Sequence, residues 1–156
     1  MINGRIVLSD FADTISNDGD IDGSISLGDG ADTVTNNVGA TITAAALASS
    51  SVVTSDSGDD EIINDGTITA TAASGNFASA LRLNGAGDKT ITNSGTIEQL
   101  STLQNDAIVV NGADSLTLTN TGSITTLGGG GGVEGIIQAN NTVSYTHLTL
   151  PTICSV

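Results

Sequence analysis

Two stretches of this chain decide its fold: Ile2-Asn3-Gly4-Arg5-Ile6-Val7-Leu8-Ser9-Asp10-Phe11-Ala12-Asp13-Thr14-Ile15-Ser16-Asn17 and Ile21-Asp22-Gly23-Ser24-Ile25-Ser26-Leu27-Gly28-Asp29-Gly30-Ala31-Asp32-Thr33-Val34-Thr35-Asn36. They align without a gap at a shift of 19 residues. A fixed sequence period of about 20 to 50 residues is typical of solenoids, in which each repeat stacks on the next. The chain is therefore expected to be a stacked repeat protein.

The repeat continues along the chain with a longer period. Its most regular feature is Asn-x-Gly-Thr/Ser-Ile, led by asparagines that lie 19, 28, 29 and 27 residues apart: Asn17, Asn36, Asn64, Asn93 and Asn120. The additional residues all enter at one phase of the repeat, in 43–50, 69–79, 98–106 and 125–135. Because insertions at one phase are loops on one side of a stacked array, we expect these four segments to project from one edge of the solenoid. They are either recognition loops on a rigid scaffold or Ala/Ser/Gly-rich stretches that arose by neutral drift.

Short runs within each repeat alternate apolar and polar residues, as in 23–27, 89–92 and 116–119. This period-two pattern, rich in β-branched residues, predicts short strands. Strands of this length in coils of about 19–29 residues predict an all-β parallel β-helix. Its interior should hold one line of stacked side chains: Ile15, Val34, Ile62, Ile91 and Leu118. The alanine-rich run 44–48 is compatible with one helical turn inside an insertion.

The asparagines are suited to the corners that follow the strands. Asn tolerates left-handed backbone conformation, and stacked Asn amides can hydrogen-bond along a ladder. Five asparagines in phase favour a ladder over unrelated turn residues. We expect the glycines that follow them to provide corners with positive φ.

The run Gly23 to Asn36, together with Asn-Ser-Gly-Thr-Ile at 93–97, resembles the passenger repeats of bacterial autotransporters and related large surface adhesins. The resemblance covers roughly residues 2–141. It implies a right-handed parallel β-helix displayed outside a Gram-negative cell, and a C-terminal translocator barrel beyond this stretch. It also implies an adhesive or structural role, with ligands on host cells, matrix or neighbouring cells.

The run Val143 to Thr152 resembles the in-frame translation of a common transposase sequencing adapter. We therefore divide the chain into a β-helix fragment, 1–141, and an adapter-derived tail, 142–156, and expect the tail to form no coil in register with the rest. The tail contains the single Tyr, His, Pro and Cys of the chain: Tyr145, His147, Pro151 and Cys154. No signal peptide follows Met1, which we interpret as an internal residue.

The formal net charge is −14, with 17 acidic and three basic residues, all before residue 142. Such a charge disfavours binding to nucleic acid and to anionic membrane surfaces, since both require Lys and Arg. It is typical of a self-repelling, soluble surface. No apolar run reaches the length of about 20 residues that a membrane-spanning helix requires.

Three chemical functions are alternatives to an inert scaffold. The run Gly28 to Val34, and more weakly 84–88, is close to a calcium-binding nonapeptide, but it occurs once per coil, which favours solvated corner aspartates. A β-helical polysaccharide-degrading enzyme would need paired carboxylates, and the densest acidic group is 59–61, interpreted as a decorated corner. Threonines flank the inward residues and predict an outward Thr-x-Thr row, similar to ice-binding β-solenoids, interrupted by Glu61 and Ile63. We expect no enzyme activity, no metal and no cofactor.

Overall fold

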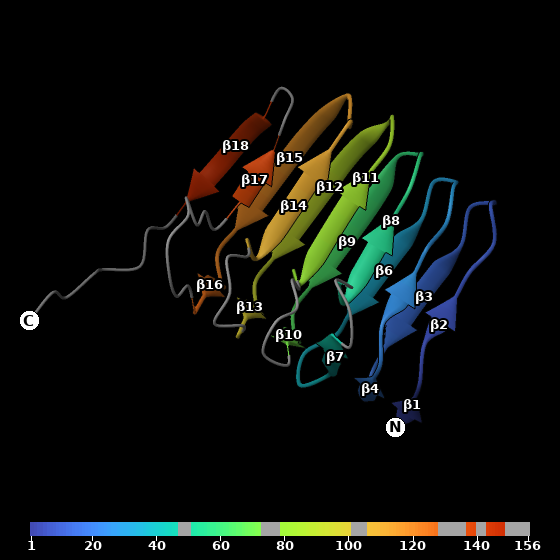
Figure 1. The fold of residues 1–156 in the computed structure, drawn as a ribbon. Coiled ribbons are helices and arrows are strands. Elements are labelled where there is room, and N and C mark those ends of the chain that lie inside the picture. Colours follow the sequence, from blue (N-terminus) through green and yellow to red (C-terminus); the bar gives the residue numbers. More distant parts are fainter. Residues whose placement is uncertain (47–50, 73–78, 101–105, 128–136, 140–142, 149–156) are drawn as a thin grey trace, which may run out of the picture.

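The computed structural model describes residues 1–46, 51–72, 79–100, 106–127, 137–139 and 143–148. Within these ranges the chain is all-β and contains no helix, so none could span a membrane. Every strand pairing is parallel, and the strands form three six-stranded sheets stacked as a β-solenoid (Figure 1). Each coil contributes one strand to each sheet in turn. The predicted parallel β-solenoid is confirmed.

Sheet A contains the strand that opens each coil. Its members are β1 (Ile2–Asn3), β4 (Asp20–Asp22), β7 (Thr41–Ala46), β10 (Thr67–Ala72), β13 (Thr96–Gln99) and β16 (Ser123–Thr126).

Sheet B contains the second strand of each coil. Its members are β2 (Ile6–Val7), β5 (Ile25–Ser26), β8 (Val53–Ser55), β11 (Leu81–Asn84), β14 (Ile108–Asn111) and β17 (Ile137–Ala139).

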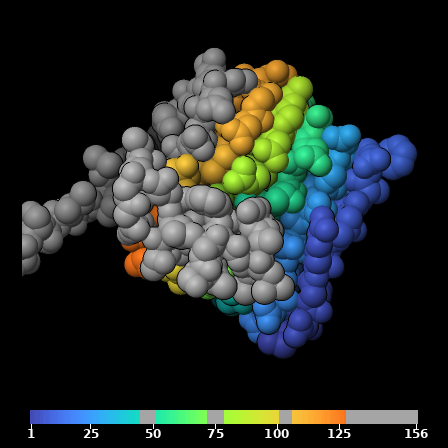
Figure 2. Space-filling model, viewed as in Figure 1, coloured from blue at the N-terminus to red at the C-terminus, as the bar shows by residue number. Residues whose placement is uncertain are grey.

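Sheet C contains the third strand. Its members are β3 (Thr14–Asn17), β6 (Thr33–Asn36), β9 (Asp60–Asn64), β12 (Asp88–Asn93), β15 (Ser115–Asn120) and β18 (Val143–Leu148). Successive coils appear as bands from blue to orange across one face of the molecule (Figure 2).

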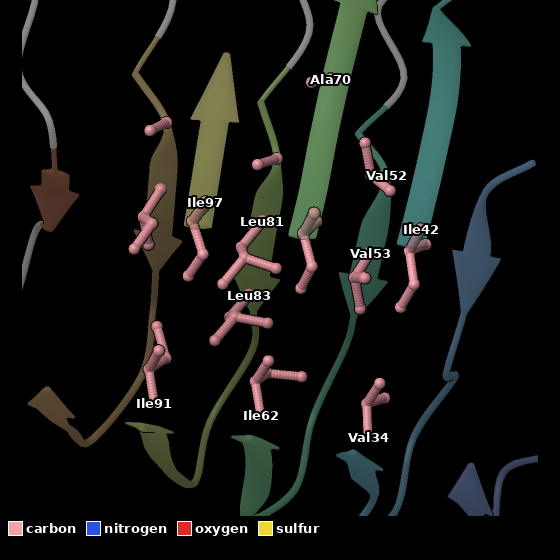
Figure 3. Close-up of a cluster of buried hydrophobic side chains, with 14 of the residues drawn as sticks. Val34, Ile42, Val52, Val53, Ile62, Ala70, Leu81, Leu83, Ile91 and Ile97 are labelled. Atoms are coloured by element: carbon pink, nitrogen blue, oxygen red, sulfur yellow. The ribbon is translucent and has the colours of Figure 1, made fainter. Parts of the chain in front are cut away.

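The interior is built from columns of aliphatic side chains, one from each coil. In sheet C, Ile15 pairs with Val34, Val34 with Ile62, Ile62 with Ile91, and Ile91 with Leu118, as predicted. All are buried except Ile15, which is partly buried at the first coil. Figure 3 shows Val34, Ile62 and Ile91 in one row on successive strands. One coil cannot bury its own inner face, and this stacking supplies the missing cover.

The glycines after the asparagines follow the prediction at Gly39, where φ is +80°, but not in the later coils. Gly66, Gly95 and Gly122 do not have positive φ. Instead, a Cβ atom at Gly95 would lie against the carbonyl oxygen of Gly66, and one at Gly122 against that of Gly95. The expectation of positive-φ corners at these three positions is wrong, because close stacking of adjacent backbones is what requires glycine. Positive φ is also found at the corner between sheets B and C, for example at Gly28 (+89°) and Gly58 (+137°).

The expectation that 142–156 forms no strand in register is wrong for 143–148. Strand β18 pairs with β15, with Val143 opposite Leu116 and Tyr145 opposite Leu118, before an irregularity that places Leu148 opposite Asn120. The alternating residues of this run suit a strand, and the edge of β15 offers unpaired backbone groups. The ladder asparagine does not recur there. The assignment of 142–156 to an adapter stays a prediction.

Candidate functional site

The four insertions enter the coil at one corner, which we call the insertion corner: the passage from a sheet A strand to the following sheet B strand. They follow β7, β10, β13 and β16 and precede β8, β11, β14 and β17. Because each of those strand sets lies consecutively in its sheet, the insertions begin and end at one phase of the solenoid. This confirms the predicted common edge for the ends of the insertions. Residues 47–50, 73–78, 101–105 and 128–136 lie outside the described residues.

The predicted bounds of the insertions were too wide. Strands β7 and β10 continue to residues 46 and 72, and pair with each other over their whole length. Ala44 pairs with Ala70, which pairs with Gln99, and all three side chains are buried. The proposed helical turn is also wrong for 44–46, which lie in β7. Small side chains that stack in a column extend the strand, and an alanine-rich sequence alone does not distinguish this from a helical turn.

Backbone hydrogen bonds between neighbouring coils fix the ends of the insertions. The amide of Leu100 donates to the Ala70 carbonyl at 2.8 Å, and that of Leu127 to the Gln99 carbonyl at 2.8 Å. On the returning side, the Val52 amide donates to the Ser79 carbonyl at 3.1 Å. The insertion corner is therefore a rigid base for the segments that depart from it.

Two leucines are exposed on this corner. Leu100 and Leu127 directly follow β13 and β16 and occupy the same phase in adjacent coils, with exposed fractions of 41% and 55%. Gln99 and Thr126, the residues before them, are paired, and the Thr126 hydroxyl donates to Gln99 Oε1 at 2.8 Å. The corner thus combines a fixed backbone with exposed apolar side chains, a combination that suits contact with a partner.

The asparagine ladder is present as predicted, within the corner between sheets C and A. Each Nδ2 donates to the Oδ1 of the next coil's asparagine, and the donor–acceptor distances are 2.9, 2.8, 2.7 and 2.7 Å from Asn17 through Asn36, Asn64 and Asn93 to Asn120. All five are buried. The same Nδ2 atoms also donate to backbone carbonyls. For example, Asn64 Nδ2 donates to the Thr96 carbonyl at 3.0 Å. The ladder satisfies the corner's buried polar groups and fixes the stacking register.

Charged side chains form a column in the interior, near the first residues of the sheet C strands, which we call the charged column. The sequence did not predict it. Asp60 pairs with Lys89 on the adjacent strand, and Lys89 Nζ lies 2.6 Å from Asp60 Oδ2, with both side chains at 0% exposure. Asp32 is also buried and precedes Asp60 in the column. The interpretation of Asp32 as a solvated corner aspartate is therefore wrong, and so is the interpretation of Asp60 as part of a decorated corner. Their position two residues before an inward Val34 or Ile62 was the available signal, because alternation continues backwards along a strand.

The two oxygens of the Asp32 carboxyl group differ in their hydrogen bonding. Its Oδ1 accepts the Asp13 amide at 2.8 Å, whereas its Oδ2 is buried without a hydrogen-bond partner among the described residues. Desolvation by burial raises the pKa of Asp32 above the usual 3.8, and the nearby carboxylate of Asp60 acts in the same direction. The column therefore holds two carboxyl groups in its interior against the single ammonium of Lys89.

The remaining candidate groups do not converge. In 28–34, Asp29 is exposed and accepts the Ser57 amide at 3.0 Å, whereas Asp32 is turned into the interior. In 59–61, Asp60 is buried in its ion pair, whereas Glu61 is exposed. Over the described ranges, no three acidic, histidine or cysteine side chains gather as metal ligands would.

The outward face of sheet C carries the predicted threonine rows. Thr33 pairs with Thr14 and Thr35 with Ser16, while Thr90 and Thr92 pair with Thr117 and Thr119. Glu61 and Ile63 occupy the same two rows in the intervening coil, so they interrupt both rows as expected.

Comparison of the chain with protein-family models, with curated proteins and with solved structures finds no match in any of the three.

Proposed function

We propose that this chain is a structural and adhesive scaffold: an acidic β-solenoid that carries binding segments along its insertion corner, on an exported bacterial surface protein of the autotransporter type. The observation that carries this proposal is the common origin of all four insertions between sheets A and B. Inward columns restrict sequence change elsewhere in the coil, whereas a loop on a rigid base can vary and bind. The partners are surface ligands on host cells, matrix or neighbouring cells.

The exposed leucines support an interaction role for this corner. Leu100 and Leu127 bring apolar surface to this corner of a molecule with a net charge of −14. An acidic surface limits nonspecific association, and apolar side chains on a fixed backbone bind at a low cost in conformational entropy.

The test replaces residues 73–78 with a Gly/Ser segment of equal length, and in a second variant changes Leu100 and Leu127 to Ser. Protein-coated beads are then scored for attachment to cell monolayers and to matrix-coated surfaces. Both variants should keep the circular dichroism of the parent and lose most attachment. The matched control is Val38→Ser, because Val38 is exposed to 84% at a different corner, between sheets C and A. Full attachment by both variants with an intact fold would show that the insertion corner is not the binding surface, and no attachment by the parent protein would indicate an inert spacer.

The paired threonine rows of sheet C favour a second candidate, ice binding. Their residue-by-residue register produces a regular outward hydroxyl array on both sides of the Glu61 coil. Thermal hysteresis should then be measurable, and it should increase when Glu61→Thr and Ile63→Thr complete the rows. A lack of hysteresis in the completed variant would exclude this function.

A further inference from the structure

The pair formed by Lys89 and Asp60 places an amine against a carboxyl group in a sealed interior. Lys89 Nζ donates to Asp60 Oδ2 at 2.6 Å, to the Gly58 carbonyl at 2.7 Å and to the Asp56 carbonyl at 2.9 Å. Three acceptors thus account for the three ammonium protons. The other carboxylate oxygen, Asp60 Oδ1, accepts the Asp32 amide at 3.2 Å. The ammonium of Lys89 and the carboxylate of Asp60 are therefore each held in place by more than one hydrogen bond.

Burial makes the charged form of this pair costly. Neither side chain has any exposure, and the desolvation penalty of a buried ion pair often exceeds its Coulombic gain. Transfer of one proton from Nζ to Oδ2, along the existing hydrogen bond, gives a neutral amine and a neutral carboxylic acid. The two carbonyl acceptors retain the other two protons of Nζ, so the lone pair that is released faces the Asp60 carboxyl group.

We propose that Lys89 and Asp60 condense to an intramolecular isopeptide bond. Nζ attacks Cγ of Asp60, the Cγ–Oδ2 bond breaks, and Oδ2 leaves as water with the proton already transferred and a second proton from Nζ. An ammonium and a carboxylate thus become one amide and one water molecule. The step requires no oxidant, reductant or external group. Fixed proximity of two reacting groups corresponds to effective concentrations of about 10⁵–10⁸ M, which compensates for the unfavourable condensation in water.

Asp32 occupies the position in the column from which it can assist. Its amide donates to Asp60 Oδ1, the atom on which negative charge develops during the attack. Its own carboxyl group is buried in the coil next to Asp60, with Oδ2 unpartnered among the described residues, and is an acid in the same interior column as the pair. Burial raises the pKa of this carboxyl group, which favours its proton-carrying form. Asp13, which is half-buried and next in the column, contacts Asp32 through its backbone amide.

The product would join two adjacent coils covalently. Asp60 opens β9 and Lys89 lies in β12, so the bond closes the chain between them into a loop. A crosslink between coils resists their separation under force and restricts the unfolded state. This inference does not depend on the adhesive role, because it concerns the interior of the solenoid.

The test is the intact mass of the purified full-length chain, followed by tryptic peptide mapping. The expected result is a protein lighter than its sequence by one water, with a branched peptide that joins Asp60 to Lys89 and no cleavage after Lys89. Lys89→Arg keeps the positive charge but removes the amine nucleophile, so its mass should match its sequence. Asp32→Asn keeps the amide donor but removes the acid, and should slow the loss of water at least tenfold when refolding protein is sampled over time.

Water can also be lost by succinimide formation at Asp-Gly sequences such as Asp29-Gly30, which the Lys89→Arg variant controls for. A full mass in the parent protein after prolonged incubation in its folded state would overturn the proposal and leave an ordinary ion pair. A loss of water that persists in Lys89→Arg, or that maps to an Asp-Gly sequence, would also overturn it. The double variant Asp60→Leu/Lys89→Met retains side-chain volume without charge and checks that the fold tolerates loss of the pair.

Discussion

Asn64 donates its side-chain amide to Oδ1 of Asn93 at 2.7 Å while its own Oδ1 accepts the amide of Asn36 at 2.8 Å. The relationship has a direction, since every donor in the ladder points toward the following coil. Each central asparagine therefore bonds to one neighbour on either side, and its removal leaves buried polar atoms unpaired on both sides.

Asn64→Leu should lower the free energy of unfolding by about 3 kcal/mol, because it leaves a donor on Asn36 and an acceptor on Asn93 with fewer partners in a buried site. Urea unfolding followed by circular dichroism measures the change. Asn37→Leu is the matched control: its side chain bonds to the exposed Asp18 and Ser16, and the loss should stay within about 0.5 kcal/mol. Equal losses in the two variants would mean that the ladder contributes no more than a surface contact.

Gly95→Ala should destabilise the fold by about 2 kcal/mol, because its Cβ would press against the backbone of Gly66 in the adjacent coil. Gly19→Ala tests the same change where nothing lies within 4 Å and φ is not positive. It should be neutral, or stabilising by about 0.5 kcal/mol through a less flexible unfolded chain. Unfolding midpoints measured side by side decide this; similar effects at both sites would show that the close coil-to-coil approach is not what selects glycine.

Asp32→Asn should stabilise the protein more at pH 8 than at pH 4. The pKa of Asp32 is raised in the folded state, so the folded chain binds its proton more tightly than the unfolded chain does. The resulting stabilisation is fully present below the usual 3.8 and is lost as the pH rises through the raised pKa. Asn removes this loss while keeping an acceptor for the Asp13 amide. Urea titrations at the two pH values measure the change in the free energy of unfolding, and Asp29→Asn, at an exposed position, is the control. A stabilisation by Asp32→Asn that is independent of pH would contradict the raised pKa of Asp32.

The sequence predicted the columns of Ile15 to Leu118 and Asn17 to Asn120 because the same residue type returns at the same phase in every coil. It did not predict the column of Asp32, Asp60 and Lys89, because its members differ in charge from coil to coil and thus resemble solvated corners. An ion pair between residues on adjacent strands can be predicted only when the register of the strands is known. Alternation from Ile62 back to Asp60, or from Ile91 back to Lys89, carried the missing information.

The insertion bounds were misjudged for a related reason. Ala44 and Ala70 belong to a column of small residues, and an alanine-rich segment has weak preference for any strand. Pairing with a neighbouring coil, a tertiary effect, extends these strands. Likewise, the pairing of β18 with β15 depends on an available sheet edge and not on whether the residues repeat the ladder.

The most direct test of the whole account is the through-space contact map of methyl groups in Ile- and Leu-labelled protein, measured by NMR. The parallel solenoid predicts contacts between Ile62 and Ile91 and between Ile91 and Leu118, residues that pair on adjacent strands β9, β12 and β15. It also predicts no close Hα–Hα contacts between these strands, since such contacts occur in antiparallel pairs. Absence of the two methyl contacts, or Hα–Hα contacts between β9 and β12, would contradict the stacked-coil structure on which the insertion corner depends.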